Sequence, residues 1–221
     1  MRIASLKKLT VVLDAQEIIP LLLTTVSIRP LIKTLGRRLS RLQNLEAAEI
    51  GSSQMNAFGI EETLIESVSK IKKITSLSLD IPDNQNKINI IAKKLANLKR
   101  ITSLTLNFSV NTSNVRPVLN KIKMYSRLEV LKIDLSDCSF APDLLSKLAE
   151  ILKKIKKLEY FNLNLQRTAV KDDEIKLLYT TIEGLPRMEY FRFHVEGCSE
   201  LSWWWRARLY AKKTLGSGEH C

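Results

Sequence analysis

A chain of 221 residues is long enough for one sizeable hydrophobic core or for a stack of small repeating units. Hydrophobic residues make up 45% of the chain but aromatic residues only 6%, which favours thin aliphatic layers, and with 7 Gly and 6 Pro the chain is neither disordered nor of low complexity. The formal charge of +12 permits binding to nucleic acid, to an anionic membrane surface or to an acidic protein, and it selects none of them.

The N-terminal region contains the most apolar stretch of the chain. The opening segment, MRIASLKKLTVVLDAQ, lacks the clean apolar run of a signal peptide because Asp14 and Glu17 interrupt it. The run IIPLLLTTVSI at 18–28 is too short to cross a bilayer and contains Pro20. We therefore expect no membrane-spanning segment.

Five segments of eight residues line up without gaps. They are ITSLSLDI from residue 74, ITSLTLNF from 101, LEVLKIDL from 128, LEYFNLNL from 158 and MEYFRFHV from 188, so successive starts lie 27, 27, 30 and 30 residues apart. Each has large apolar residues at its first, fourth, sixth and eighth positions. Two weaker copies precede them, LKKLTVVL from Leu6 and LQNLEAAE from Leu42. Such a period predicts a fold built from repeated units.

The alternation within each segment predicts a short strand with one buried face, so the fourth and sixth residues should be core residues. Between the segments, apolar residues recur at helical spacing, and we expect helices over 88–98, 115–125, 143–155 and 173–183. Strand, turn, helix and turn in every unit give parallel strands joined by right-handed crossovers. No unit can bury its apolar face alone, so the units should stack.

The pattern resembles the leucine-rich repeat, in the longer ribonuclease-inhibitor-like form with a helix in each unit. Its apolar eighth position departs from that family's usual Asn or Cys nearby and is similar instead to the divergent repeats of ciliate proteins. The resemblance implies an α/β leucine-rich-repeat solenoid, a right-handed β-α superhelix with a curved parallel sheet on the concave face and helices on the convex face. It places about seven units in 1–198, followed by a C-terminal cap or tail over 199–221. For function it implies protein binding on the concave sheet.

The third, fifth and seventh residues of each strand should point away from the core and form ladders across the sheet. Early units present Ser and Thr there, whereas later units present rings, amides and charges. Tyr and Arg are frequent anchors of protein interfaces. The alternative interpretation is that Tyr160 and Tyr190 only stack on each other and shield the sheet. The candidate partner-binding residues are Tyr160, Tyr190, Lys132, Asp134, Asn162, Asn164, Arg192 and His194.

Basic residues cluster just before the strands, at the same place in successive units, so stacking should align them along one edge of the sheet. Cations there also complement helix C-termini and cover apolar surface with their stems, which accounts for one or two per unit. The alternative is an electrostatic docking edge for nucleic acid or an acidic protein. We call this set the basic edge: Lys72, Lys73, Lys99, Arg100, Lys123, Lys153, Lys154, Lys156 and Lys157.

The tail, SELSWWWRARLYAKKTLGSG, breaks the repeat. Its adjacent tryptophan and arginine residues suit a partner or membrane interface. The alternative is that some of the tryptophans, which are Trp203, Trp204 and Trp205, cover the open end of the solenoid. A third interpretation is an unusual product of splicing or gene prediction.

Catalytic and metal-binding patterns are missing from the sequence. The two histidines, His194 and His220, have no companion in a nucleophile or metal arrangement. The run 172–174, Asp-Asp-Glu, resembles a metal cluster but falls where a helix should begin, and capping explains it. The three cysteines are Cys138, Cys198 and Cys221, and their wide spacing fits neither a disulfide framework nor a zinc site.

From these patterns we expect a non-catalytic protein-interaction scaffold, without metal or cofactor, that binds another protein on the sheet. We expect it in a reducing compartment, cytoplasmic or otherwise intracellular. The alternative is a nucleic-acid or ribonucleoprotein-associated factor that docks through the basic edge. The weak first repeat suggests a subunit of a larger assembly.

Overall fold

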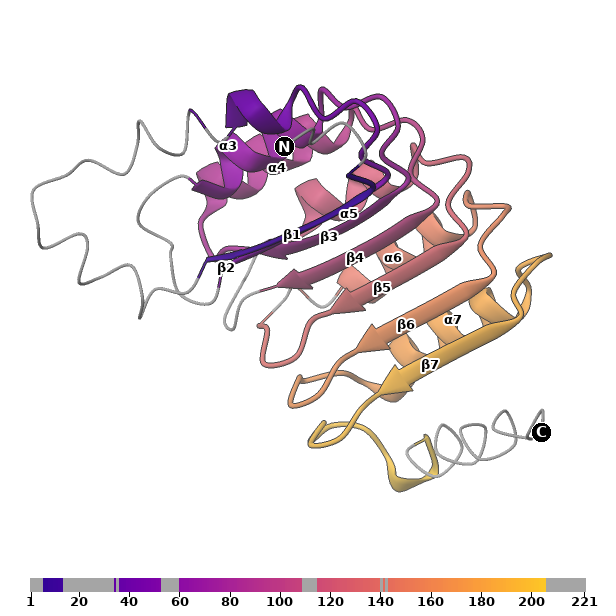
Figure 1. The fold of residues 1–221 in the computed structure, drawn as a ribbon. Coiled ribbons are helices and arrows are strands. Elements are labelled where there is room, and N and C mark those ends of the chain that lie inside the picture. The colour runs from indigo at the N-terminus through magenta and orange to yellow at the C-terminus, as the bar shows by residue number, and fades with distance from the viewer. Residues whose placement is uncertain are drawn as a thin grey trace, which may run out of the picture.

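The computed structural model describes residues 6–13, 34, 36–52, 60–108, 115–139, 141 and 143–205. Within them, seven strands form one sheet in the order of the sequence, and every neighbouring pair is parallel (Figure 1). Each of the five strong segments contains a strand, as predicted. The strands are β1 (Lys8–Leu13), β2 (Ala47–Ser52), β3 (Ser76–Ile81), β4 (Ser103–Phe108), β5 (Val130–Asp134), β6 (Tyr160–Asn164) and β7 (Tyr190–His194).

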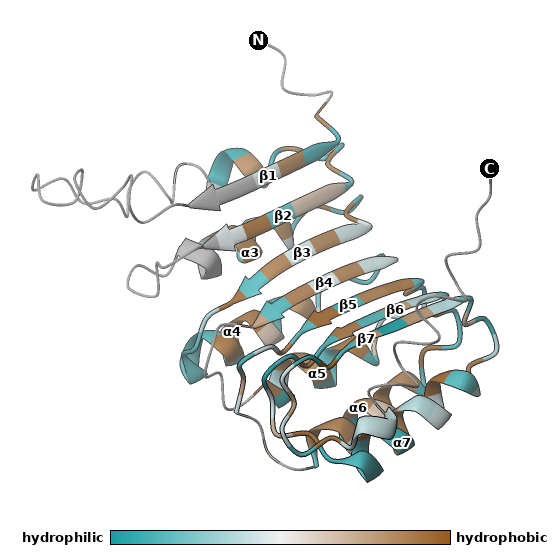
Figure 2. Ribbon diagram, turned by 90° about the horizontal axis from the view of Figure 1, so that it is seen from below, coloured by the Kyte–Doolittle hydropathy of each residue, from teal (hydrophilic) through white to brown (hydrophobic). Residues whose placement is uncertain are grey.

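Helices alternate with the strands and lie together on one face of the sheet (Figures 1 and 2). They are α3 (Ile60–Val68), α4 (Gln85–Leu95), α5 (Arg116–Ile122), α6 (Leu144–Leu152) and α7 (Asp172–Glu183). A single all-parallel sheet alternating with helices fits a leucine-rich-repeat-like fold. We call the side of the sheet opposite the helices the open face.

The helices α4, α5 and α6 each end about three residues before the predicted boundary. The backbone amides of Leu98, Tyr125 and Ile155 donate to the carbonyl three residues earlier, at 3.0, 3.0 and 2.9 Å, which closes each helix with a tighter turn. These apolar residues therefore reach the core from a turn, although their spacing is helical. The start of α4 is also earlier than predicted, because the side chain of Asn84 caps it by accepting a 3.1 Å hydrogen bond from the amide of Lys87.

The second strand corrects one part of the predicted repeat. Ala48 of β2 pairs with Leu77, the fourth residue of its own copy. The second copy therefore begins at Leu45 and reads LEAAEIGS, and the predicted start at Leu42 is wrong. A start at either leucine gives an apolar fourth residue, but only the observed register buries Ile50 at the sixth position.

The core lies between the sheet and the helices. Burial alternates along β3 and β4, and hydropathy alternates visibly along the strands in Figure 2. The fourth and sixth residues of the first four strong units are buried as predicted: Leu77, Leu79, Leu104, Leu106, Leu131, Ile133, Phe161 and Leu163. Burial of each such side chain stabilises the fold by about 1.5–3 kcal/mol. Among the described residues, no helix is long and apolar enough to cross a membrane.

Candidate functional site

The three predicted ladders are present on the open face. The register of the strands pairs the third-position residues of neighbouring units, and the fifth and seventh positions pair in the same way. The third-position ladder is Ser76, Ser103, Val130, Tyr160 and Tyr190. These residues are partly or fully exposed, in contrast to the buried residues between them. The candidate partner-binding residues are therefore brought together on β5, β6 and β7.

The seventh-position ladder is held by hydrogen bonds within the protein. Asn107 Nδ2 donates to Asp80 Oδ1 at 2.9 Å, and Asn164 Nδ2 donates to Asp134 Oδ2 at 3.1 Å. The other carboxylate oxygen of Asp134 accepts from the amide and the hydroxyl of Ser136, at 2.9 and 2.7 Å. Asp134 and Asn164 thus fix neighbouring strands and the turn that follows β5, which leaves them little capacity for a partner. His194 continues this ladder beside Asn164.

The third- and fifth-position residues form a different cluster. The rings of Tyr160 and Tyr190 stack with centroids 5.1 Å apart and an interplanar angle of 19°. Lys132 Nζ lies 5.6 Å from the centroid of the Tyr160 ring, and Arg192 Cζ lies 5.6 Å from that of Tyr190. We call these four residues the aromatic patch. The two rings stack as the alternative interpretation expected, and the stacked pair is flanked by a cation on each side.

The cations of the aromatic patch have no acidic partner in the part of the chain that the structure describes. No ion pair to Lys132 or Arg192 occurs within the described residues. Arg192 Nε is buried and donates to no acceptor there. Positive charge over two rings, with donors unused, offers a partner both apolar area and sites for carboxylate oxygens. Asn162 lies between the two cations in the fifth-position ladder.

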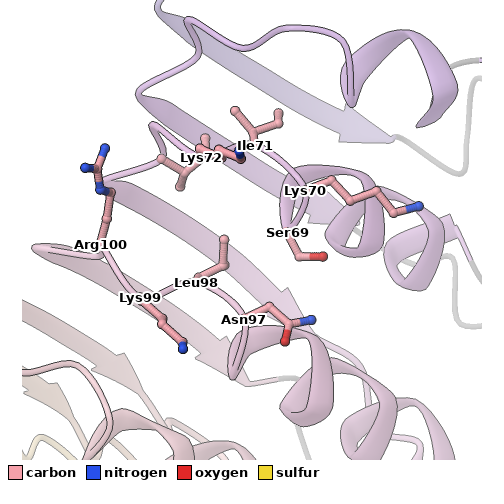
Figure 3. Close-up of a pocket in the computed structure, with 9 residues that line it drawn as sticks. Ser69, Lys70, Ile71, Lys72, Asn97, Leu98, Lys99 and Arg100 are labelled. Atoms are coloured by element: carbon pink, nitrogen blue, oxygen red, sulfur yellow. The ribbon is translucent and has the colours of Figure 1, made fainter.

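The basic edge lies where predicted, in the turns that precede the strands. All nine of its residues are exposed. The turns after α3 and α4 line a pocket of about 370 Å³, and Figure 3 shows its lining residues on both turns. Beside this pocket, a hydrogen bond from Lys70 and the charge of Lys94 lower the pKa of Glu66 below its ordinary value.

The tail residues up to Trp205 pack in part on α7, the last helix. Trp205 is 6% exposed and packs on Tyr179, with ring centroids 5.5 Å apart, whereas Trp203 is 78% exposed. The amide of Ser202 donates to Asp172 Oδ1 at 2.8 Å, which ties the tail to the start of α7. Trp205 therefore has the place of a capping residue; the residues after it lie outside the described part of the chain.

A buried polar ladder was not predicted. Cys138, Thr168 and Cys198 occupy the eleventh position of three successive units and are buried. Thr168 Oγ1 and Cys198 Sγ donate to the same carbonyl oxygen, that of Leu165, at 2.6 and 2.9 Å. The signal was a small polar residue recurring three positions after the strand segment. No group of three or more His, Cys, Asp or Glu residues that could hold a metal occurs in the described ranges.

Known proteins resemble this chain in structure. No model of a protein family matches the sequence, and no curated protein matches it. Among solved structures, one that matches is described as "Leiomodin-1 Actin-Binding Site 2 (ABS2)". It is 13% identical, covers 86% of this chain and 99% of that chain, and superposes with a TM-score of 0.49.

Proposed function

We propose that this chain is a non-catalytic protein-interaction scaffold that binds a partner through the aromatic patch on the open face of its sheet. The observation that supports the proposal most directly is the stacked pair Tyr160 and Tyr190, with a cation at each side that has no ion pair among the described residues. Rings bury much area for few rotatable bonds, and interfaces take most of their binding energy from such residues. The partner is a protein surface that presents carboxylates beside an apolar group.

The proposal includes the finer form of the fold. The units are of the ribonuclease-inhibitor-like kind, similar to the divergent repeats of ciliate proteins, and the open face is the concave side of a right-handed superhelix. A concave sheet would surround a convex partner with the ladders of several units. The chain would act in a reducing intracellular compartment, as a subunit of a larger assembly that covers its first unit.

The test begins with capture of the partner from the source cell and continues with titration of that purified partner. The double variant Tyr160→Ala/Tyr190→Ala should weaken binding at least about tenfold, which is about 1.4 kcal/mol. The matched control is Ser76→Ala/Ser103→Ala, at the same ladder position in β3 and β4. Equal affinity of the two double variants would place the partner elsewhere on the protein and overturn the proposal.

A further inference from the structure

Cations recur at one position in successive turns. The register of the turns is fixed by backbone pairing; the carbonyl oxygen of Thr75, for example, accepts from the amides of Thr102 and Ser103 at 2.8 and 3.0 Å. The residue just before each repeat segment should therefore recur at about the 4.8 Å spacing of neighbouring strands. In the five strong units this residue is an exposed cation. We call these residues the cationic row: Lys73, Arg100, Arg127, Lys157 and Arg187.

Helix ends do not account for this much positive charge. The C-terminus of a helix carries about half a negative charge, which one cation offsets. The turn after α6 carries four cations: Lys153, Lys154, Lys156 and Lys157. The turn after α3 carries three: Lys70, Lys72 and Lys73. Positive charge remains in excess after the helix carbonyls are offset.

Part of this excess lies at the pocket between the turns after α3 and α4. Its rim carries Lys70, Lys72, Lys99 and Arg100, and Figure 3 shows them on the two neighbouring turns. Lys70 pairs with Glu66 at 3.2 Å, but Lys72, Lys99 and Arg100 have no ion pair within the part of the chain that the structure describes.

Acidic neighbours distinguish the later units from this pocket. The second residue of the repeat segment is Glu129, Glu159 or Glu189 in the last three units, and Arg187 lies 3.9 Å from Glu159. At the pocket the same position holds Thr75 or Thr102, which carry no charge. Ser69 and Asn97 add a hydroxyl and an amide to the lining. The pocket therefore combines three unpaired cations with neutral hydrogen-bonding groups, which suits a phosphate group.

We propose that this pocket and the cationic row bind the phosphate backbone of a nucleic acid, without reading its bases. A linear polyanion can follow a row of cations from unit to unit, and release of its counterions drives such binding. No aromatic ring lines the pocket, so a base has no platform on which to stack. Contacts to phosphate alone position a nucleic acid and carry no sequence information.

Protein and membrane partners fit this surface less well. Lysine is depleted in protein interfaces, whose centres are apolar or aromatic, whereas the only apolar groups of the pocket are Ile71, Ile74 and Leu98, all buried in its floor. An anionic membrane is a plane, and a plane laid on the cationic row would also meet Glu129, Glu159 and Glu189 in the later units. A linear anion seated at the pocket meets Thr75 and Thr102 at this position, which carry no charge.

The experiment uses the full chain with a labelled duplex RNA, duplex DNA and single-stranded RNA, each about 20 nucleotides long, in fluorescence anisotropy across a salt series. The variant Lys99→Gln/Arg100→Gln should weaken binding about tenfold and reduce the slope of log affinity against log salt by about 1.4–1.8, two phosphate contacts. The control Lys171→Gln/Lys176→Gln removes the same charge at α7, far along the sheet from the pocket (Figure 1), and should bind as the unaltered chain does. Tyr160→Ala/Tyr190→Ala should also leave this binding unchanged, which separates the inference from the proposed protein interaction.

Three outcomes would overturn the inference. Equal weakening by the pocket variant and the α7 control would mean that net charge alone attracts the nucleic acid. Stronger binding to poly-glutamate than to the oligonucleotides would assign the surface to an acidic protein. Co-sedimentation with phosphatidylserine vesicles that exceeds oligonucleotide binding at the same salt would assign it to a membrane.

Discussion

The hydroxyl of Tyr125 donates a 2.8 Å hydrogen bond to the carbonyl oxygen of Leu95, which lies in the preceding unit. Leu95 is the last residue of α4, and its carbonyl also accepts from the amide of Leu98 at 3.0 Å. Tyr125 is buried in the turn before β5, at the position that Leu98 fills one unit earlier. A single phenol therefore joins two units in the core.

The change Tyr125→Phe should lower the free energy of unfolding by about 0.5–1.5 kcal/mol at neutral pH, because it removes a buried hydrogen bond while the Leu95 carbonyl keeps the amide of Leu98 as a donor. Chemical denaturation measures the loss, with the same slope of unfolding free energy against denaturant concentration for both proteins. Burial also raises the pKa of Tyr125 above its ordinary value of about 10. Since the folded state holds this proton more tightly, the unaltered protein should lose stability as the pH rises above about 10, and the Phe variant should lack that part of the loss. A stability difference that stays constant from pH 7 to 11 would contradict the assigned environment.

Leu106 provides a test of the sheet core. Its side chain is fully buried in β4, so Leu106→Ala should lower the free energy of unfolding by about 2–5 kcal/mol through lost burial and a cavity. Thr105→Ala, one residue earlier on the open face, should change it by less than about 0.5 kcal/mol. Urea denaturation of both variants is the measurement, and similar losses for the two would argue against the assigned faces.

The ion pair between Asp137 and Arg167 should make stability depend on pH. The hydrogen bond from Arg167, aided by its charge, holds the pKa of Asp137 below its ordinary value of about 3.9. Its stabilising effect is therefore present above that value and is lost as the pH falls through the lowered pKa. Asp137→Asn should reduce the thermal midpoint at pH 7, and the difference should vanish at the acid end of a series from pH 7 to 2. Asn tolerates the φ of 57° at this position.

The exposed carboxylate of Asp83 supplies the control for that series. It has no ion pair among the described residues, so Asp83→Asn should leave the thermal midpoint nearly unchanged at every pH. A loss at Asp83 equal to the loss at Asp137 would attribute the effect to net charge.

Much of the fold could be predicted because apolar spacing is a local property of the sequence. The prediction from apolar spacing failed at β2. There Leu42 and Leu45 offer the same local signal, and only pairing with β3 decides between them. It also failed at the helix ends, where residues such as Leu98 reach the core from a turn at helical spacing. Periodicity reports which residues are buried, and the path of the backbone between them depends on hydrogen bonds.

The candidate site was predictable only as a list of facing residues. Stacking of the strands makes Tyr160 and Tyr190 neighbours once their register is known. Whether a polar side chain on that face is already engaged depends on geometry, and the bonds of Asp134 to Asn164 and to the following turn could not be read from spacing. The same limit concealed the Thr168 hydroxyl, whose acceptor is a carbonyl in its own turn.

Two neighbouring tryptophans separate the capping role of the tail from a binding role. Trp205 is buried against Tyr179, so Trp205→Ala should lower the free energy of unfolding by about 3–5 kcal/mol. Trp203 is 78% exposed, and Trp203→Ala should change it by less than about 0.5 kcal/mol. Guanidinium denaturation followed by circular dichroism measures both, because it does not depend on the fluorescence of the residues removed. If Trp205→Ala proved as mild as Trp203→Ala, Trp205 would not cap the sheet, and both rings would be available to a partner.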